Sequence, residues 1–254
     1  MKTFLNSIIM VFVVLFMSSC SKKDTTVALA TGQLYLHLHT NIDTTEVDSY
    51  TSIISSSSGR KVSLNLAQLY ISNIELVKLD GSLFSVTGKV LLKTFENEAY
   101  LVGNVPIGNY KSIRFYVGLD AAINTQSPVS TDSVFYRPEM WFGETAQPMG
   151  YSFLNVQGKI DTTVKKNATL DQMVPFTYKI GTSANIIAVS FPDISFSVFA
   201  KQDQYIHIIV NYMNIFKGID LSKPANLSVQ TTNDNTTDLA KKIVASIPSM
   251  FSFE

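Results

Sequence analysis

The chain alternates apolar and polar residues with a period of two over most of its length. Leucines alternate with tyrosine and histidine over residues 34–39, and a similar alternation occupies residues 205–210. Residues 64–79 are apolar at odd and even positions, which predicts one long bent strand or two short ones, ended by the Asp80-Gly81 turn. Residues 84–92 are the expected hairpin partner. Strands therefore predominate in the predicted fold.

One segment, residues 237–247, has helical periodicity instead. The sequence thus predicts an all-β fold, a large antiparallel β-sandwich or barrel-like domain over residues 33–254, with one short C-terminal helix. The helix has an apolar face, a residue suited to the N-cap and a proline at its end; these are Leu239, Ile243 and Ile247, then Thr237 or Asp238, and Pro248.

The amino terminus predicts export and a lipid anchor. Residues 8–17 (IIMVFVVLFM) are apolar but fewer than the roughly 20 residues that span a bilayer, as in a signal peptide. The following Ser18-Ser19-Cys20 resembles a bacterial lipobox, so we expect residues 1–19 to be removed, Cys20 to be acylated and residues 20–32 to form a tether. This predicts a lipoprotein of the bacterial cell envelope, on its periplasmic or surface side. An ordinary signal peptide followed by an unpaired thiol is the alternative.

Composition excludes several classes of function. Twenty basic and twenty acidic residues give no net charge, and they are not clustered as nucleic acid binding requires, so no nucleic-acid partner is expected. Three His, one Trp and one Cys offer little catalytic chemistry, and motifs for hydrolases, zinc proteases or phosphate loops are missing from the sequence. We therefore expect a binding or structural protein and not an enzyme.

The three histidines are the main candidates for a metal site. His37 and His39 are two residues apart on an expected strand, so both leave the same face. A Tyr-x-His pattern occurs at 35–37 and again at 205–207, and if these strands are neighbours, His207 joins the same face. Three imidazoles suit copper or zinc better than calcium or magnesium. The alternative is that they are solvent-facing polar residues. Supplementary sulfur donors could come from Met140, Met149 or Met213, and Trp141, which follows Met140, is a further supplementary residue as an adjacent aromatic.

Several short motifs occur in an order that resembles the MbnP-like proteins, secreted bacterial β-proteins named after a periplasmic copper protein encoded alongside methanobactin. The resemblance covers most of residues 33–250. The motifs are LYLHLH at 34–39, LYISNIEL at 69–76, VPIGNY at 105–110, IRFYVGLD at 113–120, Met140-Trp141, Gly150-Tyr151, Gln157-Gly158 and FTYKIG at 176–181.

This resemblance implies extracytoplasmic copper binding by histidines and, in some family members, a tryptophan oxidised to kynurenine near the metal. His37 and His39 match the early histidine-bearing strand, and Trp141 matches the family's Met-Trp region. The chain departs from the family pattern at three places. Lys179 stands where the family often has His. The second Trp of a Trp-x-Trp pattern is missing, with Phe142-Gly143 beside Trp141, and Asn233-Asp234 stand where a His is common.

Two functions are consistent with these patterns. One is a copper-binding lipoprotein that uses His37 and His39, with His207 as a further ligand. The other is a metal-free surface module on the same scaffold, in which tyrosine and phenylalanine side chains contact a protein or glycan partner. The positions of the three histidines and Trp141 relative to one another distinguish them.

Overall fold

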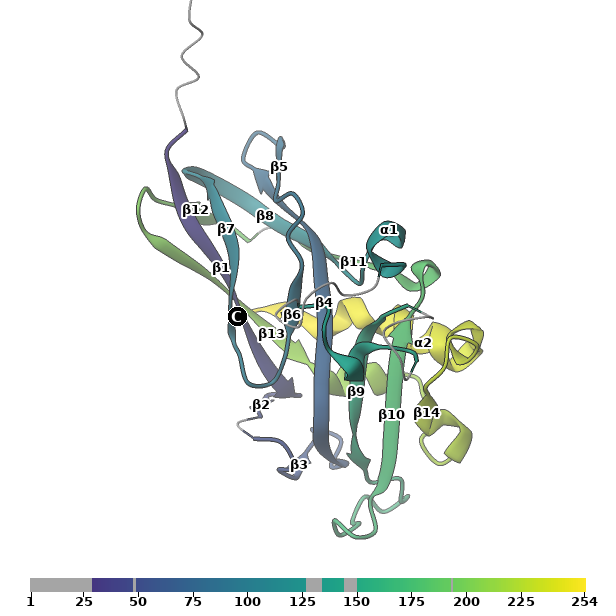
Figure 1. Cartoon of the computed structure of the whole chain (residues 1–254). Coiled ribbons are helices and arrows are strands. Elements are labelled where there is room, and N and C mark those ends of the chain that lie inside the picture. The colour runs from purple at the N-terminus through teal and green to yellow at the C-terminus, as the bar shows by residue number, and fades with distance from the viewer. Residues whose placement is uncertain (1–28, 48, 127–133, 144–149, 193) are drawn as a thin grey trace, which may run out of the picture.

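A computed structural model of the chain describes residues 29–47, 49–126, 134–143, 150–192 and 194–254. The expected signal peptide, Cys20 and Met149 lie outside these residues. Within the described part, the strands form two sheets packed face to face, so the predicted all-β fold is confirmed. Figure 1 shows β1, β7 and β13 in one layer and β4, β9 and β10 in the other.

The smaller sheet has the strand order β15-β13-β1-β2, and β7 pairs with the first half of β1. Its strands come from both ends of the chain, so residues far apart in sequence become neighbours. The bounds are β1 (Thr31–Ile42), β2 (Thr45–Glu46), β7 (Ala99–Pro106), β13 (Asp203–Asn211) and β15 (Phe251–Phe253).

The larger sheet is built around β4, which is one long strand and pairs with five others. The predicted hairpin partner is confirmed but divided, since β5 and β6 each pair antiparallel with β4. The bounds are β3 (Ile54–Ser55), β4 (Lys61–Lys78), β5 (Leu83–Ser85), β6 (Leu91–Lys93), β8 (Gly108–Val117), β9 (Ser152–Ile160), β10 (Val174–Gly181), β11 (Ile187–Phe191), β12 (Phe196–Val198) and β14 (Ser228–Val229).

The expectation that the sheets are antiparallel is wrong at two places. β1 runs parallel to β13 over nine residue pairs, and β10 runs parallel to β14. A parallel pair needs a long crossover, and here the chain visits the larger sheet between β1 and β13. Alternation within a strand is the same for both directions, so the pattern predicted the faces of β1 but not its orientation to β13.

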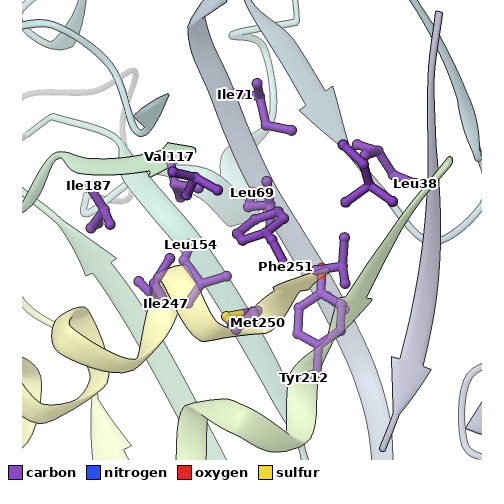
Figure 2. Close-up of a cluster of buried hydrophobic side chains, with 14 of the residues drawn as sticks. Leu38, Leu69, Ile71, Val117, Leu154, Ile187, Tyr212, Ile247, Met250 and Phe251 are labelled. Carbon is purple, nitrogen blue, oxygen red and sulfur yellow. The ribbon is translucent and has the colours of Figure 1, made fainter. Parts of the chain in front are cut away.

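The hydrophobic core lies between the sheets. Figure 2 shows Leu38 of β1 together with Leu69 and Ile71 of β4, all fully buried, and Ile247 and Met250 closing the core from the C-terminal segment. The leucines of β1 are all on this side, which leaves the polar half of the same strand on the outer face of the smaller sheet.

The helices are short. The predicted helix is confirmed within a residue at each end, with the Thr237 hydroxyl accepting a hydrogen bond from Ala240 N, whereas the other helix was not expected. In the described residues no helix is long and apolar enough to span a membrane. The bounds are α1 (Ala121–Asn124) and α2 (Asp238–Ser246), with 3₁₀ turns η1 (Pro138–Met140), η2 (Ser183–Asn185), η3 (Tyr212–Phe216), η4 (Pro224–Leu227), η5 (Asp234–Thr236) and η6 (Ile247–Met250).

Candidate metal centre

The outer face of β1 carries the first two histidines. Because side chains alternate along a strand, the buried leucines at 34, 36 and 38 leave Tyr35, His37 and His39 on the opposite face. The imidazole rings of His37 and His39 pack edge to face, with centroids 4.4 Å apart. This part of the predicted site is placed by local alternation alone.

The parallel pairing of β1 with β13 adds the third histidine. The register aligns Tyr35 with Tyr205 and His37 with His207, so the repeated Tyr-x-His patterns lie side by side. The two tyrosine rings stack at 4.9 Å between centroids. The expectation that these two strands are neighbours is therefore confirmed, and the three histidines share one face.

Three ring nitrogens meet at one point of this face. His37 Nδ1 lies 3.0 Å from His207 Nδ1, and His39 Nε2 lies 3.4 Å from the same atom. A neutral imidazole has a single N–H, so His207 Nδ1 can donate at most one proton to the two nitrogens that face it. Such a group of nitrogens is therefore better suited to binding a cation than to forming hydrogen bonds among its own members.

Two carboxylates hold the opposite edges of these rings. Glu98 Oε2 lies 3.1 Å from His37 Nε2, and Glu46 Oε1 lies 2.7 Å from His39 Nδ1. A carboxylate at one ring nitrogen keeps the proton there and leaves the lone pair on the other nitrogen. In both rings that other nitrogen is the one that faces His207. The same carboxylate, histidine and metal arrangement is common around protein metal ions.

Strand pairing brings these carboxylates to the histidines. Glu98 immediately precedes β7, whose Ala99 is paired with His37, and its carbonyl accepts a hydrogen bond from Leu38 N. Glu46 lies on β2, which folds back along the end of β1 after a turn at Asp43 with φ 52°. Neither position has a local sequence signal, which is why sequence reasoning missed both residues.

A third carboxylate lies beside His207. Glu254 follows β15, and its backbone N donates to the His207 carbonyl at 3.3 Å. Its Oε2 lies 3.4 Å from His39 Nε2 and 3.5 Å from His207 Nδ1. Sequence reasoning missed Glu254 as well, because only the pairing of β13 with β15 brings it here.

The site is open to solvent on one side. The side chains of His37 and His39 are 23% and 15% exposed, whereas those of His207 and the three carboxylates are about half exposed. An ion could therefore enter directly from solvent without a change in the fold.

A buried lysine lies beneath this part of β1. Lys93 is fully buried, and its Nζ donates to Thr40 Oγ1 at 2.5 Å and to the Thr94 carbonyl at 2.9 Å. Burial lowers the pKa of Lys93 to about 8, and the negative charges of Glu98 and Glu96 partly oppose this shift. The lysine contributes a buried positive charge on the core side of the sheet.

The structure does not bring Trp141 and Met140 to the histidines. Both pack in a separate cluster against the larger sheet, where Met140 is fully buried and Trp141 Nε1 donates to the Phe135 carbonyl. The expectation that they supplement the histidines is therefore not supported by their position. Both are apolar and pack against Tyr151 and Phe153, which explains their burial there. Met213 packs against the main core.

The lysine that departs from the family pattern lies beside this second cluster. Lys179 Nζ donates to the Trp141 carbonyl at 3.1 Å, and burial lowers the pKa of Lys179 while the charge of Glu139 opposes that shift. An ammonium group at this position repels a metal cation. The histidine cluster and the tryptophan region are thus two separate places in this protein.

Comparisons with known proteins agree with this fold. A family model described as MbnP matches residues 31–235. The solved structure described as MbnP from Methylosinus trichosporium is similar with a TM-score of 0.59 and 16% sequence identity, covering 87% of this chain and 98% of that one. No curated protein matches the sequence. Since the family model spans most of the chain, this protein belongs to the MbnP family.

Proposed function

We propose that this protein is an extracytoplasmic, non-catalytic lipoprotein that binds copper through His37, His39 and His207. The observation that carries the proposal is the convergence of His37 Nδ1, His39 Nε2 and His207 Nδ1. Imidazole nitrogens suit copper and zinc, and copper forms the more stable complexes of the two.

The spacing of the nitrogens fits a metal ion. Ligand bonds of 2.0–2.1 Å in a tetrahedral centre separate the ligand atoms by about 3.3–3.4 Å. The separations of 3.0 Å between His37 Nδ1 and His207 Nδ1 and of 3.4 Å between His39 Nε2 and His207 Nδ1 are close to this value. Glu98 and Glu46, on the far ring nitrogens, would hold both imidazoles in the orientation that a bound ion requires.

Metal titration of the purified protein tests the proposal. We expect one equivalent of copper to bind to the wild type and the His37→Ala/His39→Ala variant to lose at least a hundredfold in affinity. Gln33→Ala is the matched control, because Gln33 lies on the same face of β1 but outside the cluster, and it should bind as the wild type does. A wild type without stoichiometric binding, or a double variant with unchanged affinity, would contradict the proposal.

One observation favours a second candidate, a metal-free contact surface. Tyr35, Tyr205 and Leu101 form a row across the same outer face, and Tyr205 and Leu101 are 42% and 39% exposed. This row could contact a protein or a glycan. If the wild type binds no metal while Tyr35→Ala/Tyr205→Ala loses binding to a glycan array that the wild type recognises, this candidate replaces the first.

A further inference from the structure

Glu254 differs from the other two carboxylates in where it approaches the histidines. Glu46 and Glu98 contact ring nitrogens that face away from the centre. Glu254 Oε2 instead approaches His39 Nε2 and His207 Nδ1, two of the three nitrogens that converge. It therefore lies beside two of the three converging nitrogens, those of His39 and His207.

The distances at Glu254 are those of two ligands on one ion. A charge-assisted hydrogen bond between a nitrogen and a carboxylate is about 2.7–2.9 Å long, as at Glu46. Glu254 Oε2 is 3.4 and 3.5 Å from the two nitrogens, too long for such a bond. Both values agree with the edge of about 3.3–3.4 Å expected for a tetrahedral centre.

We propose that Glu254 is the fourth ligand of the centre and that the resulting set of three imidazoles and one carboxylate selects Cu(II) over Cu(I). This inference rests on the proposed function, because it needs an ion held by the three histidines. A carboxylate oxygen is a hard donor that stabilises the more highly charged ion, whereas Cu(I) prefers soft thiolate or thioether sulfur.

The described methionines offer no such sulfur to this centre. Met140 packs with Trp141 against the larger sheet, Met213 and Met250 pack with the main core, and Met173 is buried. Among the described residues, the groups of metal-binding side chains here contain only imidazole and carboxylate. The donor chemistry is thus that of a divalent ion.

The charge of the surrounding sheet also favours Cu(II) over Cu(I). The five strands of the smaller sheet are described in full and contain no Lys or Arg, although the chain has twenty such residues. Glu46, Glu98 and Glu254 surround the histidines, and Asp203 lies at the start of β13. A surface of one sign raises the local concentration of the opposite ion, and more strongly for a dication than for a monocation.

Glu46 and Glu98 do not compete for this role. With His39 they make a second group of donor atoms, yet each already contacts the ring nitrogen that lies opposite the centre. An ion at the centre leaves these contacts intact. The two carboxylates are therefore positioning residues, and Glu254 is a ligand.

The test measures Cu(II) and Cu(I) affinities of the full protein and of Glu254→Gln. We expect the variant to lose at least tenfold in Cu(II) affinity and less than threefold in Cu(I) affinity, which raises the reduction potential by about 59 mV for each tenfold difference. The Cu(II) electron paramagnetic resonance spectrum should change as an oxygen ligand is lost. Asp203→Asn is the matched control, because it removes one acid from the same sheet at a distance from the cluster.

The two proposals fail in different ways. If Glu254→Gln matches Asp203→Asn in both affinities and in its spectrum, Glu254 is not a ligand, while copper binding that depends on the histidines still stands. If the wild type binds Cu(I) more tightly than Cu(II), the selection is wrong even where Glu254 is a ligand. A wild type that binds no copper overturns both proposals.

Discussion

Gly158 of β9 lies very close to the neighbouring strands β4 and β10 of the larger sheet. A Cβ at this position would lie 2.0 Å from the Ser63 carbonyl oxygen of β4 and 3.0 Å from the Phe176 ring of β10. Backbone on one side and a buried ring on the other leave no room for a methyl group. We expect Gly158→Ala to lower the free energy of unfolding by about 2–3 kcal/mol in urea denaturation.

Gly218 provides the control for that substitution. It has φ +73°, and an added Cβ meets nothing within 4 Å. Gly218→Ala should therefore lose only the roughly 1 kcal/mol of a left-handed backbone in an L-residue. Equal losses at the two positions would mean that β4 and β9 separate easily, contrary to the packing described above.

Lys93 makes stability depend on pH. Its pKa is about 8 in the folded protein and about 10.4 when unfolded, so the unfolded chain binds more protons between these values. The free-energy cost of burying the Lys93 charge is fully present below pH 8 and disappears as the pH rises toward 10.4. The contribution of Lys93 to the free energy of unfolding should therefore increase by about 2 kcal/mol from pH 7.5 to pH 10.

The measurement compares wild type with Lys93→Met by urea unfolding at both pH values. Methionine keeps the length of the side chain and removes the charge, so the difference between the two proteins isolates Lys93. Tyr50 and Tyr100, whose pKa values burial raises to about 12, titrate in both proteins and cancel. A difference that is constant with pH would show that Lys93 is not buried as a cation.

The candidate site shows how far single residues could be predicted. The alternation around His37 and His39, with the repeated Tyr-x-His at His207, was sufficient to predict three imidazoles on one face. Glu98, Glu46 and Glu254 could not be found in this way, because each is brought to the site by the pairing of a different strand. The predicted donor Met140 and the predicted adjacent aromatic Trp141 are apolar residues that pack in a separate cluster.

At the level of elements, Asn235 joins the larger sheet to the segment before α2. Its side chain accepts from Gly181 N at 2.9 Å and donates to the carbonyls of Lys179 and Thr231, each at 2.9 Å, and it is 4% exposed. Asn235→Leu has a similar volume but leaves these buried backbone groups without partners. We expect a loss of about 3 kcal/mol in the free energy of unfolding, measured in urea.

Thr237→Ala serves as the comparison for Asn235. Thr237 lies two residues after Asn235, and its hydroxyl caps α2. Removing this hydroxyl should lower the free energy of unfolding by about 1 kcal/mol. If Asn235→Leu cost no more than Thr237→Ala, the link between β10 and the helical segment would be dispensable, and the buried amide would need another explanation.

The motifs that carry the family resemblance are those that join elements. Ser72 Oγ donates to the Gly118 carbonyl at 2.7 Å, tying β4 to the end of β8, and Tyr110 Oη donates to the Pro106 carbonyl across the turn between β7 and β8. Gly118 has φ +128°, and Asp120 caps α1. These residues specify the scaffold, which explains why the family could be recognised from sequence, whereas the carboxylates around the histidines could not.

The direction and register in which strands pair could not be predicted from the sequence. Period-two alternation gave the all-β class and the long β4, and Asp80-Gly81 ends that strand as expected. The parallel pair of β1 and β13 depends on a crossover that includes all strands of the larger sheet except β14, and no local pattern encodes it. The candidate metal site lies across this pair.

For the molecule as a whole, the predicted lipid anchor would hold the candidate site at a membrane surface. Cys20 is the only cysteine of the chain and lies eleven residues before β1. We expect Cys20→Ser to release the protein from the membrane fraction and to abolish incorporation of labelled palmitate, because a protein near neutral charge has no other strong attraction to lipid. Ser21→Ala is the neighbouring control. A wild type that incorporates no palmitate and is not found in the membrane fraction would favour the ordinary signal peptide.

Metal binding should also stabilise the entire fold, because its ligands come from opposite ends of the chain. His37 and His207 are 170 positions apart, and Glu254 directly follows β15, a third strand of the same sheet. Unfolding separates these residues, so an ion bound only by the folded protein adds about 2.7 kcal/mol at a free concentration of 100 times Kd. For a domain of this size that raises Tm by roughly 5–10 °C. Calorimetry of the wild type and of His37→Ala/His39→Ala with buffered Cu(II) measures this, and an equal shift in both proteins would mean that copper binds elsewhere.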